Sequence, residues 1–154
     1  MLTAHRMKMN VPGRVRNTDV PLQNALLPLI ETIVNSIHAT EERFGSEVAL
    51  KGRVDVVIHR VQQPKLQSFP GRPPVEPILG FTVSDNGSGF TDENLESFET
   101  ADSEAKASRG GKGVGRFTWL VVFEKALVTS TFKGKDGGSL RRSFTFEPTE
   151  TGIS

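Results

Sequence analysis

The stretch SRGGKGVGRFTWL, residues 108–120, surrounds Lys112 with glycines and leads directly into an apolar run. Glycine tolerates backbone conformations and close approaches that other residues resist, so such loops often surround phosphate groups. The P-loop pattern fails, because position 106 is lysine rather than glycine and Lys112 is followed by glycine. The dinucleotide pattern also fails, because position 116 is arginine and a polar stretch rather than a strand precedes the loop. The loop therefore predicts either a phosphate-binding segment of another kind or a plain turn.

The composition is that of one soluble domain. The chain has 154 residues, of which 36% are hydrophobic and 24% are charged, and its formal net charge of +1 gives no reason to expect a nucleic-acid partner. The absence of cysteine excludes disulfides, thiolate metal sites and cysteine nucleophiles. The N-terminus has no apolar run of the signal-peptide type, and no run approaches the length of a membrane span. We therefore expect a cytoplasmic protein with no membrane partner.

The first long element of the chain is a helix. Residues 1–20 are basic and polar and predict an arm or a short strand. Residues 18–45 predict a helix that Thr18 or Asp19 caps and Gly45 ends, and Pro28 should kink this helix or divide it. Apolar residues recur along it at helical spacing and predict a core-facing stripe: Leu22, Leu26, Leu29, Ile30, Ile33, Val34 and Ile37.

The rest of the chain alternates strands, turns and short helices. Strands are predicted over 53–61 and 78–85, separated by a proline-rich loop. A short helix follows over 91–98, with Thr91 or Asp92 as its cap, and a buried helix is predicted over 114–124 after the polar segment 99–111. Strands over 125–132 and 139–146 form a hairpin. This order predicts an α+β fold with one antiparallel or mixed sheet and helices on one face.

Two further stretches place polar residues beside apolar elements. In residues 30–40, IETIVNSIHAT, the side chains of Glu31, Asn35 and His38 share one helical face. In residues 81–90, FTVSDNGSGF, an aspartate ends an apolar strand and two glycines follow it. Each stretch also has a plain structural interpretation, as a solvated helix edge and as an Asn-Gly turn.

Taken together and in this order, the three stretches resemble the motifs of the GHKL superfamily of ATPases. ETIVNSIHA resembles the N-box, DNGSG the first glycine box and GGKGVG the second, and the resemblance spans Pro21 to Phe132. The superfamily includes type II topoisomerase ATPase domains, ninety-kilodalton heat-shock chaperones, MutL-type repair proteins and sensor histidine kinases. The resemblance implies a Bergerat fold, a two-layer α+β sandwich with a mixed, mostly antiparallel sheet. This domain would occupy residues 21–154, after an N-terminal arm over 1–20, as the N-terminal part of a longer protein.

The resemblance also implies roles for individual residues, with ATP and Mg²⁺ as ligands. Asn35 would supply an oxygen ligand to Mg²⁺, and Glu31 would orient or deprotonate the attacking water. Asp85 would accept a hydrogen bond from the adenine amino group, and Gly87 and Gly89 would let the chain pass close under the base.

The second glycine box would surround the phosphates and hinge a lid over residues 90–112. The phosphate-binding residues implied by the resemblance are Gly111, Lys112, Gly113, Val114 and Gly115. Arg116 would add a charge near the phosphates or pair with a surface acid. Phe117, Trp119 and Leu120 would belong to the core of the helix that anchors the hinge.

The choice of branch rests on Glu31. Histidine kinases of this superfamily usually have asparagine there, so the glutamate favours a hydrolase. Two positions depart from the pattern: His38 replaces an aspartate, and the usual Gly-Thr pair of a late strand is absent. Either that pair lies beyond residue 154, or Thr145 or another residue substitutes.

The resemblance finally implies how the activity would be used. In the hydrolase branch a second domain commonly supplies a lysine to the γ-phosphate, so the isolated domain should bind ATP with Mg²⁺ but hydrolyse it slowly. Hydrolysis would drive lid closure and a conformational or dimerisation switch, with an ATP-dependent homodimer of the full protein as the partner. The alternatives are a protein kinase of the same superfamily and an interaction module that has lost nucleotide binding.

Overall fold

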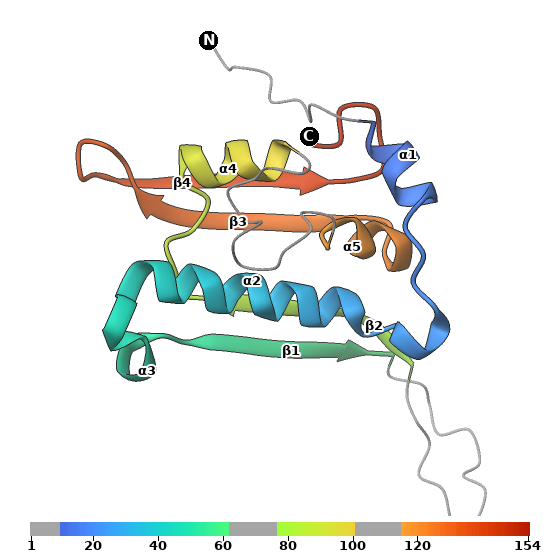
Figure 1. The fold of residues 1–154 in the computed structure, drawn as a ribbon, viewed down its shortest axis with the longest axis horizontal. Helices are drawn as coiled ribbons and strands as arrows, with labels where there is room; N and C mark the ends of the chain where they lie inside the picture. The colour runs from blue at the N-terminus through green and yellow to red at the C-terminus, as the bar shows by residue number, and fades with distance from the viewer. Residues whose placement is uncertain (1–9, 62–76, 101–114) are drawn as a thin grey trace, which may run out of the picture.

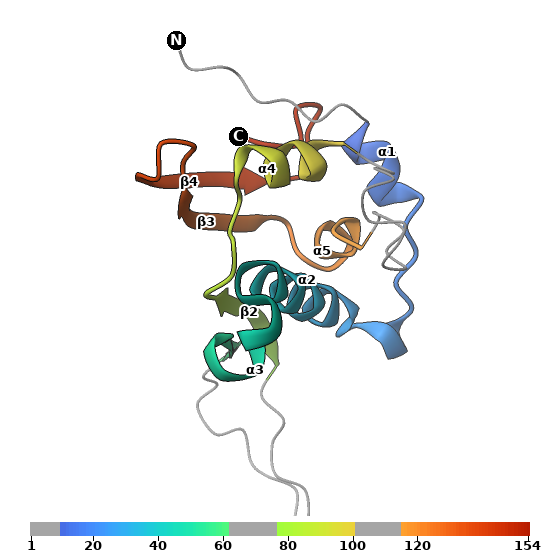
Figure 2. The same ribbon diagram turned by 60° about the vertical axis from the view of Figure 1, so that its left-hand side comes forward.

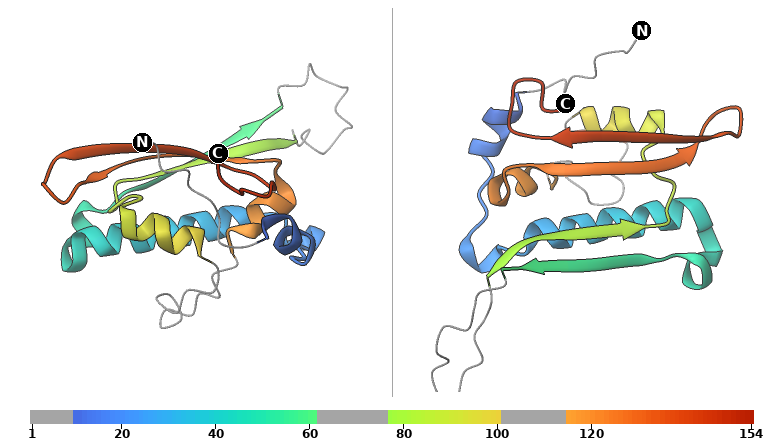
Figure 3. Two further views of the ribbon diagram at one scale, coloured as in Figure 1. Left: turned by 90° about the horizontal axis from the view of Figure 1, so that it is seen from above. Right: turned by 180° about the vertical axis from the view of Figure 1, so that it is seen from behind.

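The computed structural model describes residues 10–61, 77–100 and 115–154 and shows an α+β protein in which helices cover a layer of strands (Figure 1). The strands are β1 (Val54–Arg60), β2 (Ile78–Asp85), β3 (Ala126–Lys133) and β4 (Ser139–Phe146). The α-helices are α1 (Val11–Arg16), α2 (Leu27–Phe44), α3 (Val48–Lys51), α4 (Asp92–Glu99) and α5 (Phe117–Val122), with short 3-10 turns at Leu22–Asn24 and Gly45–Glu47. Seen from above, α2, α4 and α5 lie on the same face of the strand layer, as the sequence predicted (Figure 3).

The strands differ from the prediction in how they pair. Within the described residues they form two separate antiparallel hairpins, β1–β2 and β3–β4, rather than one antiparallel or mixed sheet. The turn after β2 contacts the second hairpin, where the Phe90 amide donates to the Ser130 hydroxyl of β3 at 2.8 Å.

The register of the first hairpin places apolar residues opposite one another, with Val56 opposite Val83 and Ile58 opposite Phe81. The second hairpin closes through a turn in which the Gly134 amide donates to the Gly138 carbonyl. The predicted bounds of β2 and β4 are confirmed, and β1 and β3 each differ from the prediction by one residue at both ends.

The buried core lies on the β3–β4 side of the molecule. It is rich in phenylalanine, and the rings of Phe90, Phe98, Phe144 and Phe146 meet mostly edge to face at 5.2–5.5 Å. The buried cluster as a whole comprises Val11, Leu95, Phe98, Phe117, Leu120, Phe144, Phe146 and Ile153. Phe117 and Leu120 are core residues as predicted, and Trp119 packs against the cluster. The helices α4 and α5 are thus fixed to the second hairpin.

Helix α2 begins and ends at the residues that interrupt helices. Pro28 lies in its first turn, where a missing amide hydrogen costs nothing, so the predicted helix is divided before Leu27 rather than capped by Thr18 or Asp19. At the other end Gly45 adopts φ +52° and terminates the helix.

The predicted core stripe of α2 is wrong for most of its members. Leu29 is buried, but Leu26, Ile30, Val34 and Ile37 are 53%, 54%, 40% and 42% exposed. The residues of α2 that are buried are Pro28, Leu29, Ser36 and Thr40. Small and hydroxyl-bearing side chains therefore occupy much of the buried side, and this allows α2 to approach the turn after β2 closely.

The N-terminal segment contains a helix where an arm or a strand was expected. Asn10 caps α1 by accepting a hydrogen bond from the Gly13 amide at 2.8 Å, and Pro12 fits the first turn. Val11 is completely buried, and α1 contacts α5. The prediction was wrong because a six-residue segment that contains proline and glycine is typical of a loop. The signal for a helix is the capping asparagine that precedes it.

Candidate functional site

Helix α2 supplies the polar side chains that the sequence singled out. Glu31 and His38 are half-buried and Asn35 is exposed. Within the described residues, neither Glu31 nor Asn35 has a side-chain hydrogen bond or ion pair. Both therefore remain available for a ligand, with oxygen atoms one helical turn apart.

Asp85 lies at the end of β2 and is held in place from two sides. Its Oδ2 accepts a hydrogen bond from the Ser36 hydroxyl at 2.8 Å, and its Oδ1 accepts one from the Gly87 amide at 2.9 Å. Ser36 belongs to α2, so this contact joins the helix of Glu31 to the strand of Asp85 over 49 positions of sequence. Sequence reasoning missed Ser36, although a hydroxyl that interrupts the apolar pattern one residue after Asn35 was a usable signal.

The two glycines after Asp85 have packing roles. A Cβ at Gly87 would lie 2.5–2.7 Å from the backbone and Cβ of Ala39, so only glycine fits between the turn and α2. Gly89 has φ +75°, and a Cβ there would lie 2.6 Å from the Ser130 hydroxyl. The turn is therefore held between α2 and β3, whether or not a nucleotide base lies above it.

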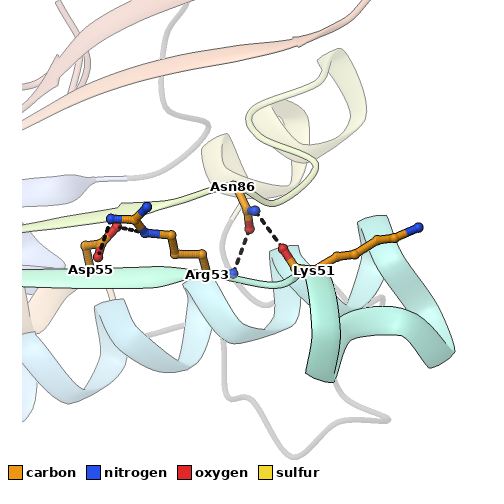
Figure 4. A network of polar contacts seen from close by, with 4 residues as sticks. All are labelled: Lys51, Arg53, Asp55 and Asn86. Atoms are coloured by element: carbon orange, nitrogen blue, oxygen red, sulfur yellow. Dashed lines mark hydrogen bonds and ion pairs between the residues drawn. The ribbon is translucent and has the colours of Figure 1, made fainter.

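Asn86, between Asp85 and Gly87, fixes the turn to the start of β1 (Figure 4). Its side chain accepts a hydrogen bond from the Arg53 amide and donates one to the Lys51 carbonyl, each at 2.8 Å. Beside it, the hydrogen bond from Arg53 to Asp55 and the charge of that carboxylate raise the pKa of the Arg53 guanidinium. That ion pair is exposed and contributes little to stability. The Asn86 bonds replace part of the backbone pairing at this end of the hairpin.

The last turns of α2 provide a further support. Arg43 donates to the Asn86 carbonyl at 2.7 Å, and the Ser88 hydroxyl donates to the Glu42 carboxylate at 2.5 Å. Helix α2 lies against β2 and runs beside it (Figures 1 and 2). The same helix therefore presents Glu31 near one end and holds the turn at the other.

Gly115, the last residue of the second glycine box, touches the Glu31 side chain. A Cβ at position 115 would lie 2.0 Å from Glu31 Oε2, so any other residue here would displace the carboxylate. The other predicted phosphate-binding residues, Gly111, Lys112, Gly113 and Val114, lie outside the described residues. Of the predicted lid over 90–112, the described part includes α4, whose Leu95 and Phe98 are buried in the core. This part is packed in the core in the structure, and closure of a lid over 90–112 stays a prediction.

The structure thus brings several of the predicted residues together on α2. Asp85 bonds to it, Gly87 packs on it, and Gly115 meets Glu31, which shares the helix with Asn35. Thr145, the suggested substitute for the missing Gly-Thr pair, lies on β4 and bonds through its backbone to Ser154. On β4 it lies opposite Leu127 of β3, and β3 lies between β4 and β2 (Figure 1).

The described part of the chain contains no group of three or more histidine, aspartate or glutamate residues placed to hold a metal ion. It also contains no helix of sufficient length and apolar character to cross a membrane.

Comparisons with protein-family models, with curated proteins and with solved structures each found no match. The case for a function consequently depends on the residues of this chain and on their geometry.

Proposed function

We propose that this chain is an ATP-binding domain of the GHKL type that binds ATP with Mg²⁺ and hydrolyses it, slowly when the domain is isolated. One observation supports this proposal: residues of three motifs that are far apart in sequence lie on α2 or contact it. Asp85 of the first glycine box bonds to Ser36, and Gly115 of the second lies against Glu31. A shared ligand site on α2 requires such a convergence of the three motifs.

The proposed nucleotide site assigns the base to the Asp85 end of α2 and the phosphates to the Glu31 end. The Asp85 carboxylate is fixed by Ser36 and Gly87, so it is already oriented to accept a hydrogen bond from an adenine amino group. Guanine carries an acceptor at that position and would face repulsion there. Glu31 is placed beside the backbone of the glycine box, where a carboxylate can orient a water molecule toward a phosphate.

Mg²⁺ fits the oxygen chemistry of this helix edge. Bound with ATP, it would neutralise charge on the phosphate oxygens. Asn35 offers a neutral amide oxygen, and a magnesium ion commonly takes few protein ligands and completes its shell with phosphates and water.

Isothermal titration with ATP and Mg²⁺ tests the binding step directly, and an absence of detectable binding contradicts the proposal. The catalytic step is tested with Glu31→Gln, which should lower turnover by about 10²-fold or more while leaving ATP binding intact. Glu41→Gln is a matched control, because it makes the same chemical change at an exposed position of the same helix. Equal turnover in the two variants would remove Glu31 from its assigned role.

A further inference from the structure

Arg116 is a buried cation at the junction of α4 and α5. Arg116 is only 8% exposed. Its guanidinium carbon lies 5.1 Å from the ring centroid of Phe98 and 5.3 Å from that of Phe117. It donates a hydrogen bond to the carbonyl of Thr100, just after α4, at 3.0 Å. Burial of a charge is costly unless its partners compensate, and the two aromatic faces and the Thr100 carbonyl contribute to that compensation. The arginine therefore fixes the start of α5 to the end of α4.

The residue before Arg116 is Gly115, whose backbone lies against the Glu31 carboxylate. The Gly115 carbonyl is itself fixed, since it accepts hydrogen bonds from the Thr118 amide at 3.0 Å and the Thr118 hydroxyl at 2.5 Å. We call the Gly115 backbone at the start of α5 the corner. Because it lies against the Glu31 carboxylate, its position limits where that carboxylate can lie. Arg116 follows Gly115 directly, so the contacts of its buried side chain help to fix this corner together with the Thr118 hydrogen bonds.

We propose that Arg116 is a positioning residue for Glu31: it holds Gly115 against the carboxylate and so sets where that carboxylate points. The effect on catalysis rests on the proposed function. The contacts among Arg116, Gly115 and Glu31 do not depend on it. The positioning role also gives a reason for an arginine in the helix-capping position of α5, where its side chain makes no capping hydrogen bond.

The chain supplies a matched control in Arg142. This arginine lies over the ring of Phe132 at 4.7 Å, donates to the carbonyl of Phe90, and pairs with Asp92 at 2.7 Å. It holds the other end of α4 to β4, by the same combination of aromatic face and backbone carbonyl. Removal of either arginine should loosen α4, but only Arg116 is adjacent to the Gly115 corner.

The first experiment needs no nucleotide. It measures hydrogen exchange of the Thr118 amide, which donates to the Gly115 carbonyl at 3.0 Å, in the wild type, Arg116→Met and Arg142→Met. If Arg116 holds the corner, Arg116→Met should accelerate exchange of this amide by about tenfold or more, whereas Arg142→Met should leave it unchanged. An unchanged rate in Arg116→Met, or an equal rise in both variants, overturns the proposal.

The second experiment measures ATP turnover and ATP affinity separately. Arg116→Met should lower kcat by about 10- to 100-fold, the scale expected when a reacting group is misplaced by about 1 Å, with little change in ATP affinity. Arg116→Lys keeps a cation over the rings and should recover much of the lost rate, whereas Arg142→Met should keep the wild-type kcat. A parallel fall in affinity and kcat, or an equal fall for Arg142→Met, overturns the positioning role. If the wild-type protein binds no ATP, the proposed function fails, and the hydrogen-exchange experiment still decides whether Arg116 holds the corner.

Discussion

Replacement of Gly87 by alanine tests whether the turn after β2 is held by close packing against α2. The added Cβ would lie 2.5 Å from the carbonyl carbon of Ala39, 2.6 Å from its Cβ and 2.7 Å from its carbonyl oxygen. These are rigid atoms of a helix, so the turn itself must move. Movement would lengthen the hydrogen bond from the Ser88 amide to the Ala39 carbonyl, now 3.0 Å.

The expected cost follows from these two effects. Overpacking in a well-packed site costs about 1–3 kcal/mol, and loss of the backbone hydrogen bond adds about 1 kcal/mol. Gly87→Ala should therefore lower the free energy of unfolding by about 2–4 kcal/mol, which corresponds to a fall of about 5–15 °C in Tm for a chain of this size.

Gly80→Ala is the control, because Gly80 belongs to the same hairpin and a Cβ there meets nothing within 4 Å. Urea denaturation of both variants gives the comparison, and Gly80→Ala should change stability by less than about 0.5 kcal/mol. Adding Ala39→Gly to Gly87→Ala should restore only part of the loss, because the carbonyl of residue 39 remains in the way. Equal stability of the Gly87→Ala and Gly80→Ala variants would refute the packing argument.

Three further substitutions test the neighbouring contacts. Ser36→Ala removes a donor from the Asp85 carboxylate, so ATP affinity measured by titration should fall by about tenfold, whereas binding of inorganic triphosphate with Mg²⁺ should not change. Asn86→Ala should lower the urea-derived free energy of unfolding by about 1–3 kcal/mol, and Asn86→Asp should lose less, because it can still accept one of the two hydrogen bonds. Phe98→Ala should cost about 3–5 kcal/mol in the same assay, since this ring is buried at the centre of the aromatic cluster.

The elements with local signals were predictable from the sequence. The bounds of β2 and β4 follow from apolar patterns interrupted by turn residues, and Gly45 marks the end of α2 because its φ of +52° suits glycine. Thr91 caps α4 as expected, since its hydroxyl accepts from the Asn94 amide. Each of these features is decided within a few residues of chain.

The errors concern contacts between distant segments. The rotation of α2 depends on Ala39 and Ser36 meeting the turn after β2, and no periodicity within the helix encodes that partner. The apolar stripe therefore predicted the wrong buried side. The separation of the strands into two hairpins likewise concerns pairing between distant segments, which strand propensity does not reveal.

The residues of the candidate site divide into two groups that stability measurements can separate. Gly87, Asn86 and Ser36 all have structural partners, so their substitution should cost stability in any function that the chain performs. Their presence alone does not favour nucleotide binding over a packed turn. Glu31 and Asn35 differ, because no side-chain hydrogen bond or ion pair within the described residues explains either of them.

Polar groups retained for a ligand rather than for folding often reduce stability, and their removal is then neutral or stabilising. We therefore expect Glu31→Gln and Asn35→Ala to leave the urea midpoint unchanged or slightly raised, while turnover is lost in the first and Mg²⁺-dependent ATP affinity in the second. Glu41→Gln, on the same helix, should alter neither property. If Glu31→Gln or Asn35→Ala instead destabilised the fold by more than about 1 kcal/mol, that residue would have a structural role, and the argument for a nucleotide site on α2 would lose its most specific support.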